Sequence, residues 1–252
     1  MSALSAEANA GAVALVTGGG TGIGRATALE LGRTGARVVI CGRRTEPLET
    51  TRAELEAMGV ECLARPTDIR EPEDSDALVE EALSAFGRVD VLVNNAGGQF
   101  TAPAQEITLK GWRAVHRLSV DATWQLTRAV AVRSMIPNRG GVIFFNTFSP
   151  RRGIPGYAHA ASARAALENL AGGLAVEWGR HGIRVIALAL GNIHTGGLEG
   201  YGDDLEAMAA HVPLGRLGTP EEVAAITAFL ASPAAGYVSG TTVTIDGGLD
   251  AT

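Results

Sequence analysis

Cysteine is scarce in this chain of 252 residues. Only Cys41 and Cys62 occur, and neither belongs to a CxxC pair or to a His/Cys cluster with metal-ligand spacing. Cysteines placed in this way are typical of free buried thiols, because disulfide frameworks and zinc sites need paired ligands. The sequence therefore predicts neither a disulfide framework nor a metal site.

Excess positive charge and long apolar stretches are also missing. The formal net charge is −6 at pH 7, so the chain lacks the basic field that binds nucleic acid or an anionic membrane. No stretch approaches the ~20 apolar residues that a membrane span requires. The N-terminal sequence has no basic n-region, and its apolar run is too short for a signal peptide. We expect a soluble, cytoplasmic protein without a nucleic-acid or membrane partner.

The order of the apolar segments indicates the fold class. Hydrophobic residues make up 46% of the chain, which is enough for a substantial core. Segments rich in Val, Ile, Leu or Phe predict buried strands at 13–17, 37–41, 61–65, 89–94, 142–146, 184–190 and 242–246. Segments of helical length and spacing lie between them, at 22–34, 47–58, 72–86, 111–135, 160–180 and 220–232. Buried strands that alternate with helices imply an α/β fold, with a parallel sheet covered by helices on both faces.

The chain has no linker, repeat or low-complexity tract, so we expect a single domain over residues 1–252. Residues 1–11 precede the first predicted strand and are expected to be a flexible N-terminus. Residues 195–213 are rich in glycine and small side chains and show no clear strand. Such segments are often mobile and functional, and this one is expected to be a substrate lid.

A glycine-rich turn follows the first predicted strand and leads into a predicted helix, with the sequence TGGGTGIG at residues 17–24. Such a turn lets the backbone approach a pyrophosphate, whose charge then lies at the helix N-terminus. The absence of a Gly-Lys-Ser/Thr ending excludes a Walker loop. By itself the pattern also occurs as a plain tight connection, so other segments must support a cofactor site.

Further segments do so. The turn at residues 17–24 resembles the TGxxxGxG fingerprint of the short-chain dehydrogenase/reductase family, and residues 94–97 (NNAG) resemble that family's motif after the fourth strand. Residues 191–195 (GNIHT) resemble its PG-x-I-x-T segment, with Leu190 in place of the proline. The resemblance covers roughly residues 11–249. It implies a Rossmann-type doubly wound sheet, an oxidoreductase with a nicotinamide cofactor and a small-molecule substrate, and a homodimer or homotetramer.

The resemblance assigns cofactor contacts to Gly18, Thr21, Gly22, Ile23, Gly24, Asp68, Ile69, Asn95, Ala96, Gly97, Arg164, Gly191, Ile193 and Thr195. The second predicted strand is followed by Gly42-Arg43-Arg44, where NAD-specific relatives carry an acid that binds the ribose 2′-hydroxyl. Arginine forms charge-assisted, often bidentate hydrogen bonds with phosphate. We therefore expect NADPH rather than NADH, with Arg43 the better candidate of the two arginines for the 2′-phosphate.

The catalytic positions depart from the family pattern. Residues 165–178 resemble the helix that follows the family's lysine, which places Arg164 at the lysine position and Ala160 at the tyrosine position. By the same count, Thr147 takes the serine position and Ser119 the position of the supporting asparagine. Arginine can hold the nicotinamide ribose but cannot release a proton, because its pKa exceeds ~12. The family's usual proton donor is therefore missing.

Nearby side chains are candidates for the vacant roles. Tyr157 lies seven residues before Arg164, on the same helical face if the helix extends that far. His159 has an imidazole suited to proton transfer near neutral pH. Tyr157 and His159 are therefore the candidate acids, and Arg164 is the candidate for positioning the ribose. Thr147 and Ser149 follow the fifth predicted strand, where ligands gather in such sheets, and are candidate donors to the substrate oxygen. A packing or turn role is the alternative for each.

A shorter resemblance bears on the substrate. Residues 153–165 (GIPGYAHAASARA) and 198–202 (LEGYG) are similar to stretches of the peroxisomal trans-2-enoyl-CoA and 2,4-dienoyl-CoA reductases. Reduction of a conjugated enoyl thioester forms a delocalised enolate that hydrogen-bond donors can stabilise. It therefore tolerates loss of the tyrosine better than ketone reduction does. Arg151 and Arg152 are either candidate contacts for the phosphates of a CoA ester or a solvated pair.

Three functions are consistent with these residues. The first is an NADPH-dependent reductase of an enoyl thioester or another conjugated carbonyl. The second is a ketone/alcohol oxidoreductase in which Tyr157 or His159 replaces the family's tyrosine. The third is a cofactor-binding protein without redox activity, which Ala160 and Arg164 motivate.

Overall fold

The computed structural model describes residues 4–149, 153–196 and 205–251. Its centre is a seven-stranded sheet in the order β3-β2-β1-β4-β5-β6-β7, in which all neighbouring strands pair in parallel. The strands are β1 (Val13–Thr17), β2 (Arg37–Gly42), β3 (Cys62–Pro66), β4 (Val91–Asn94), β5 (Gly141–Phe148), β6 (Ile183–Leu190) and β7 (Thr241–Ile245). The strand order reverses between β1 and β4, so a crevice opens at their carboxyl ends. This is the predicted single-domain, Rossmann-type α/β fold.

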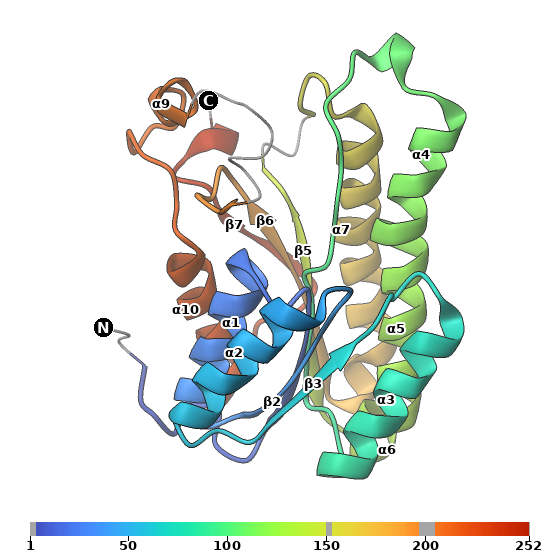
Figure 1. The fold of residues 1–252 in the computed structure, drawn as a ribbon, viewed down its shortest axis with the longest axis vertical. Coiled ribbons are helices and arrows are strands. Elements are labelled where there is room, and N and C mark those ends of the chain that lie inside the picture. Colours follow the sequence, from blue (N-terminus) through green and yellow to red (C-terminus); the bar gives the residue numbers. More distant parts are fainter. Residues whose placement is uncertain (1–3, 150–152, 197–204, 252) are drawn as a thin grey trace.

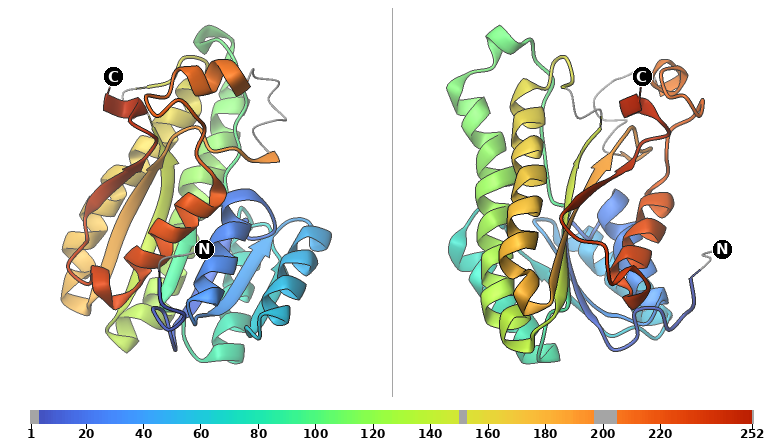
Figure 2. Two further views of the ribbon diagram at one scale, coloured as in Figure 1. Left: turned by 90° about the vertical axis from the view of Figure 1, so that its left-hand side faces the viewer. Right: turned by 180° about the vertical axis from the view of Figure 1, so that it is seen from behind.

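Helices cover both faces of the sheet (Figures 1 and 2). One face carries α1 (Gly22–Arg33), α2 (Thr45–Ala57) and α10 (Pro220–Ala231). The other carries α3 (Pro72–Phe86), α4 (Leu109–His116), α5 (Thr123–Val130), α6 (Ile136–Asn138) and α7 (Ala158–Trp178). The short α9 (Leu205–Ala210) lies near the C-terminus. Single 3₁₀ turns occupy Ala104–Glu106, Gly179–His181, Pro233–Ala235 and Leu249–Ala251.

The alternation of side chains along each strand builds two apolar cores. In β1, Val13 and Leu15 pack into the core beneath α3, α5 and α7. Ala14 and Val16 pack into the opposite core, beneath α1, α2 and α10. Burying a large aliphatic side chain contributes roughly 1.5–3 kcal/mol, so a strand that is apolar at every position is stable only between two helical layers. The continuous apolar runs of the sequence follow from this arrangement.

Local sequence signals set several helix ends. α3 begins with Pro72 in its first turn and ends at Phe86, and the C-cap residue Gly87 adopts the left-handed conformation with φ 78°. α10 begins with a capping box, in which Thr219 Oγ1 accepts from the Glu222 N–H at 3.2 Å and Glu222 Oε2 accepts from the Thr219 N–H at 2.9 Å. These pairings satisfy backbone donors that a helix start leaves unpaired.

The predicted helix at 111–135 is longer and less regular than its pattern indicated. The helical run extends from α4 to α6 and contains two π-helical segments, Arg117–Ala122 and Ala131–Met135. A π-turn shifts the helical face without interrupting the helix, so apolar periodicity does not reveal it. Such turns are frequent at functional sites. Ser119, which the resemblance predicts at the position of the family's asparagine, is buried in the first of them.

The expected flexible N-terminus and the expected lid lie partly within the described residues. Asn9 is buried, and its side-chain amide donates to Thr34 Oγ1 at 2.9 Å and to the Ala228 carbonyl at 3.1 Å. This part of the expected flexible N-terminus is therefore tied to α1 and α10. The expected lid at 195–213 lies partly outside the described residues, and within them it includes α9. None of the helices in the described ranges has the length and apolar character needed to span a bilayer.

Candidate active site

A cavity of about 660 Å³ lies over the carboxyl ends of the first strands, at the crevice between β1 and β4. It brings together the predicted cofactor residues Gly18, Thr21, Gly22, Ile23, Arg43, Arg44, Asp68, Ile69, Asn95, Ala96, Gly97 and Thr195. These residues come from separate stretches of the chain, and the sheet topology places them together. Of the remaining predicted contacts, Arg164, Gly191 and Ile193 line a neighbouring cavity, and Gly24 lines neither of the two.

The turn between β1 and α1 requires glycine at specific positions. Gly18 has φ 66°, and a Cβ added there would lie 2.9 Å from Asn95 Nδ2. A Cβ added at Gly24 would lie 2.2 Å from the Gly18 carbonyl oxygen. Gly24 thus allows α1 to approach the turn closely, and its role is packing against the turn.

The N-terminus of α1 is available to an anion. Its N-cap, Thr21, makes no side-chain capping bond, and the first turn holds no acidic residue. The first N–H groups of the helix therefore have no side-chain cap among the described residues, and the positive end of the helix dipole lies toward the cavity. A dinucleotide's pyrophosphate suits this backbone-lined hollow and could accept hydrogen bonds from these donors.

Thr17 ties this turn to the NNAG segment. Its Oγ1 accepts from the backbone N–H groups of Asn95, at 3.0 Å, and Ala96, at 2.9 Å. Asn95 Nδ2 donates to the Thr17 carbonyl at 2.9 Å, and Asn95 Oδ1 accepts from Asn146 Nδ2 at 3.0 Å. Asn95 therefore links β1, β4 and β5 at the edge of the cavity. Thr17 was not among the predicted site residues, although it opens the quoted motif.

Arg43 and Arg44 are exposed at the rim of the first cavity. Neither has a hydrogen bond or an ion pair within the described ranges, whereas most arginines on this part of the surface pair with a carboxylate. Two cations that lack a partner in that part of the chain can bind a phosphate without first losing an existing contact.

A second cavity, of about 600 Å³, adjoins the first, and Ile23, Asn95, Gly97 and Thr195 line both. The predicted catalytic residues Thr147, Ser149, Tyr157 and Arg164 line it, and His159 does not. Ile154, Pro155 and Met208 add apolar surface to its wall. The two adjoining cavities could hold a cofactor in the first and a substrate in the second.

Arg164 is buried where the two cavities meet. Its Nη1 donates to the Asn146 carbonyl at 2.8 Å, and its guanidinium lies 5.3 Å from the centre of the Phe148 ring. A Cβ added at Gly97 would lie 2.0 Å from Arg164 Nη2, so this glycine admits the guanidinium. The arginine therefore brings a fixed positive charge to the boundary between the cavities.

The hydroxyls of Thr147 and Ser149 donate to protein acceptors. Thr147 Oγ1 faces Glu168 Oε1 at 3.0 Å and the Leu188 carbonyl at 3.3 Å. Ser149 Oγ donates to Asp246, which also accepts the backbone N–H of Gly248 at 2.8 Å. Neither hydroxyl can donate to a substrate oxygen without giving up its present acceptor.

Tyr157 has the opposite arrangement. Its phenolic oxygen shares a hydrogen bond with the hydroxyl of Thr101 at 2.7 Å, its one side-chain partner among the described residues. Because a hydroxyl can either donate or accept, the phenol can accept from Thr101 and donate into the second cavity, which it lines. Tyr157 is therefore the predicted acid that the geometry supports.

His159 lies behind the wall of the second cavity. It is fully buried, its ring lies 4.2 Å from that of Phe100, and neither ring nitrogen has a hydrogen-bond partner among the residues described. Burial, with a smaller contribution from the charge of His116, lowers the pKa of His159. A neutral, enclosed imidazole is poorly placed to protonate a substrate, although the sequence made it an equal candidate.

Comparisons with known proteins identify the family. The family model described as Enoyl-(Acyl carrier protein) reductase matches residues 18–250. A Bacillus subtilis protein named “Probable 2,4-dienoyl-CoA reductase” is 40% identical over 240 residues, which cover 93% of this chain and 94% of that protein. The gluconate 5-dehydrogenase of Gluconobacter oxydans is 35% identical over 95% of this chain and 94% of its own length. The chain belongs to the short-chain dehydrogenase/reductase family.

A solved member of this family has the same architecture. The 7α-hydroxysteroid dehydrogenase in complex with NADH and 7-oxo glycochenodeoxycholic acid superposes with a TM-score of 0.92, at 32% identity and with 97% of each chain covered. By its family, the present chain is therefore an oxidoreductase. Its relatives carry names for both double-bond reduction and alcohol oxidation.

The sequence contains one lysine, Lys110, which lies in the first turn of α4 and lines neither cavity. Ala160, which the resemblance predicts at the family's tyrosine position, is buried in a small apolar cluster with Val115 and Ala163. Arg164 is thus the cation that the second cavity offers at the start of α7.

Glu168, which the sequence analysis did not single out, lines neither cavity but bonds to the Thr147 hydroxyl beside the second one. It lies four residues after Arg164 on α7, and its Oε2 also accepts from Thr242 Oγ1 at 3.5 Å. The i,i+4 spacing from Arg164 could have indicated that both side chains share one helical face. Arg151, Arg152 and residues 198–202, which motivated the CoA-ester prediction, lie outside the described residues. In the described ranges, no three His, Cys, Asp or Glu residues gather as a metal site.

Proposed function

We propose that this short-chain dehydrogenase/reductase uses NADPH to reduce the conjugated double bond of an enoyl or dienoyl thioester. The observation that carries the proposal is that two groups line the second cavity: Tyr157, whose one side-chain partner among the described residues is another hydroxyl, and Arg164, a cation that cannot release a proton. This pair suits the stabilisation of an oxyanion better than rapid protonation of an alkoxide. The relative named as a dienoyl-CoA reductase and the enoyl reductase family model support the same choice.

NADPH is proposed over NADH because of Arg43 and Arg44. Position 42, where an acid would accept bonds from a ribose 2′-hydroxyl, is glycine. The two guanidinium groups that follow are free of protein partners in the described ranges and line the first cavity. A 2′-phosphate at this rim would gain charge-assisted hydrogen bonds from one or both of them.

The protein's part in the reaction is to bind, orient and stabilise charge. When bound, NADPH would supply the hydride that reduces the conjugated system. Arg164 would hold its ribose and add positive potential at the boundary of the two cavities. The Tyr157 hydroxyl donates to the thioester oxygen as negative charge develops there. The α-carbon then takes a proton from water, so no side chain need lose one in the hydride step.

A second candidate function is a ketone/alcohol oxidoreductase. In that reaction Tyr157 would give its proton to the substrate oxygen as hydride arrives. The hydrogen bond from Thr101 Oγ1 would stabilise the phenolate that remains. The relative named gluconate 5-dehydrogenase supports this alternative.

A substrate panel separates these functions. NADPH oxidation is followed by absorbance with short enoyl-CoA and dienoyl-CoA esters, and in parallel with ketones and diketones. We expect turnover with the conjugated thioesters and a kcat/KM lower by about tenfold or more with the ketones, whose alkoxide needs an acid. Turnover with ketones alone would establish the second function. Tight NADPH binding by calorimetry without turnover of any substrate would favour a cofactor-binding protein without redox activity.

A further inference from the structure

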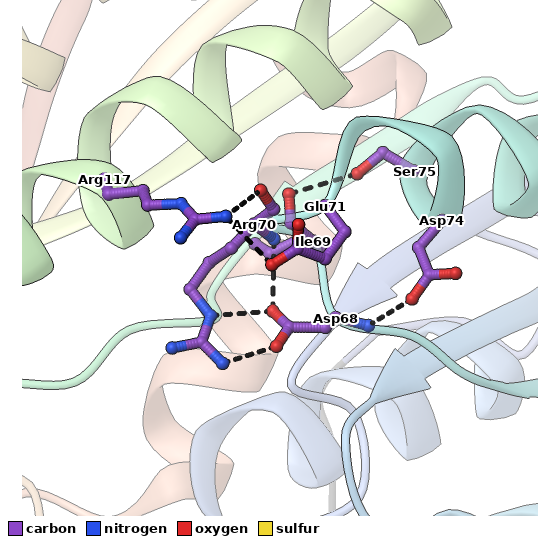
Figure 3. Close-up of polar contacts among 7 residues, drawn as sticks. All are labelled: Asp68, Ile69, Arg70, Glu71, Asp74, Ser75 and Arg117. Atoms are coloured by element: carbon purple, nitrogen blue, oxygen red, sulfur yellow. Dashed lines mark hydrogen bonds and ion pairs between the residues drawn. The ribbon is translucent and has the colours of Figure 1, made fainter.

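The turn after β3 places an ion pair at the edge of the first cavity. Asp68 lines this cavity together with Arg43 and Arg44. The Asp68 carboxylate is held by the guanidinium of Arg70, with Arg70 Nε 2.8 Å from Asp68 Oδ1 and Arg70 Nη2 bonded to Asp68 Oδ2 (Figure 3). The Arg70 backbone N–H donates to the same Oδ1 at 3.1 Å. Arg70 is not among the residues that line the cavity, so any effect it has there passes through Asp68.

The turn that carries this pair is fixed by neighbouring helices (Figure 3). Ser75 Oγ of α3 donates to the Ile69 carbonyl at 3.2 Å. Arg117, at the start of the first π-helical segment, donates to the Arg70 carbonyl at 3.2 Å and to Glu71 Oε1 at 2.8 Å. With its backbone held from both sides, Arg70 presents its guanidinium to Asp68 in a two-point contact. Such a contact adds geometric specificity to the charge attraction.

Without this contact, the charge of Asp68 would oppose phosphate binding. The hydrogen bond from Arg70 is the main cause that lowers the pKa of Asp68 to about 2, so this carboxylate is ionised at neutral pH. The charge of Arg43 also acts on Asp68, although no ion pair joins these two described side chains. If Arg70 were absent, the Asp68 carboxylate and a 2′-phosphate would compete for the guanidinium of Arg43, and the two anions would repel each other.

We propose that Arg70 determines the cofactor preference: by binding Asp68 it keeps Arg43 and Arg44 available to the 2′-phosphate of NADPH. This inference rests on the proposed use of NADPH and adds a residue to it. Arg70 is a positioning residue, because it touches Asp68 and not the cavity where the cofactor would bind.

The test measures dissociation constants for NADPH and NADH on the wild-type protein and on Arg70→Met, Asp68→Asn and the double variant. The readout is the ratio of the two constants. In Arg70→Met we expect the preference for NADPH to fall about tenfold, the order of magnitude of one lost charge-assisted contact. In the Asp68→Asn background, the same Arg70→Met change should alter the ratio by less than about twofold, because the competing charge is already gone.

Measuring both cofactors on one preparation protects the test against misfolding, because a loss of folded protein affects both titrations alike. Arg43→Ala and Arg44→Ala serve as controls for the phosphate contact. If the wild-type protein shows no preference for NADPH, the proposed cofactor choice fails and the inference with it. If the wild type prefers NADPH and an arginine control loses that preference, an unchanged ratio in Arg70→Met overturns the role of Arg70 alone.

Two other outcomes also overturn the inference. If Arg70→Met lowers the preference equally with and without the Asp68→Asn change, Arg70 contacts the phosphate directly. Retention of the preference in both Arg43→Ala and Arg44→Ala would mean that these arginines do not receive the phosphate. The first outcome leaves the choice of NADPH intact, and the second removes its present explanation.

Discussion

At the scale of single residues, the hydrogen bonds already made by the hydroxyls of the second cavity decide which of them can donate to a substrate. Thr147 and Ser149 donate to the carboxylates of Glu168 and Asp246, whereas the partner of Tyr157 is the hydroxyl of Thr101, which can donate as well as accept. Hydrogen bonds to carboxylates are stronger than those between neutral groups, so the first two hydroxyls are held in place. We infer that Thr147 and Ser149 shape the site, while Tyr157 is the group free to contact substrate.

Tyr157→Phe should lower kcat/KM by about a hundredfold, the usual cost of removing one oxyanion donor. NADPH affinity should change little, because Tyr157 does not line the first cavity. Steady-state kinetics and cofactor titration check both parts. Thr101→Val is the matched control: it leaves the phenol in place but removes the bond that orients it, so a smaller loss is expected. Full activity in Tyr157→Phe would show that the assigned donor is wrong.

His159 predicts a dependence of stability on pH. Because burial lowers its pKa in the folded state, the unfolded chain binds the proton more readily. The stability that the neutral imidazole contributes is present above the unfolded pKa of about 6.5 and is lost as the pH falls through the lower folded value.

The midpoint of thermal unfolding should therefore fall more steeply below about pH 6.5 in the wild type than in His159→Phe. Phenylalanine keeps a ring against Phe100 and removes the titrating group. His211→Phe, at an exposed position just after α9, is the control and should leave the wild-type profile unchanged. Parallel pH profiles for the wild type and His159→Phe would contradict the assignment.

At the scale of elements, the site depends on how closely α1 approaches the turn that follows β1. Gly24 permits this approach, and Thr17 connects the same turn to the segment after β4. The N-terminus of α1 is therefore fixed in position while its N–H groups remain uncapped. Disturbing that approach should affect cofactor binding and folding together.

Gly24→Ala should lower the free energy of unfolding by roughly 1–3 kcal/mol, because the new methyl group would overlap the Gly18 carbonyl. NADPH binding should weaken in the same variant. Gly179→Ala is the matched control, since Gly179 has a helical φ of −55° and no atom within 4 Å of an added Cβ. It should be neutral or stabilising by up to about 1 kcal/mol. Urea unfolding and calorimetry measure the two effects, and equal stability of the two variants would refute the packing role of Gly24.

At the scale of the whole molecule, the helices opposite α1 present apolar side chains to solvent. Trp124 of α5 stacks on Trp178 of α7 with ring centres 6.4 Å apart, and Val132 and Val176 are 52% and 85% exposed. Exposed apolar groups that gather on neighbouring elements are typical of interfaces. The resemblance to short-chain dehydrogenases/reductases implied a homodimer or homotetramer, and we propose that this surface takes part in it.

Light scattering should therefore find a dimer or a tetramer, and Val176→Glu should shift the mass toward the monomer by placing charge in the contact. Met58→Glu is the control, because Met58 is also exposed, at 47%, but follows α2 on the opposite layer. It should leave the mass unchanged. A monomeric wild-type protein would contradict the proposed assembly.

Local and repetitive features of the chain were readable from the amino-acid sequence. The strand and helix segments follow from apolar periodicity, and the glycine turn follows from a backbone geometry that few other residues tolerate. The register of α7 placed Arg164 in the site for the same reason, because a helix fixes the relation between near neighbours. These predictions depend on interactions within a few residues of each other.

The tertiary structure alone decided which polar groups have partners. Side-chain hydrogen bonds join Thr147 to Glu168, 21 positions away in the sequence, and Ser149 to Asp246, 97 positions away. Another joins Thr101 to Tyr157, 56 positions away. His159 and Tyr157 are two residues apart, yet the rotation of α7 encloses the imidazole and leaves the phenol in the cavity. Hydrogen-bond partnership and burial depend on distances through space that only the packing of helices on the sheet sets.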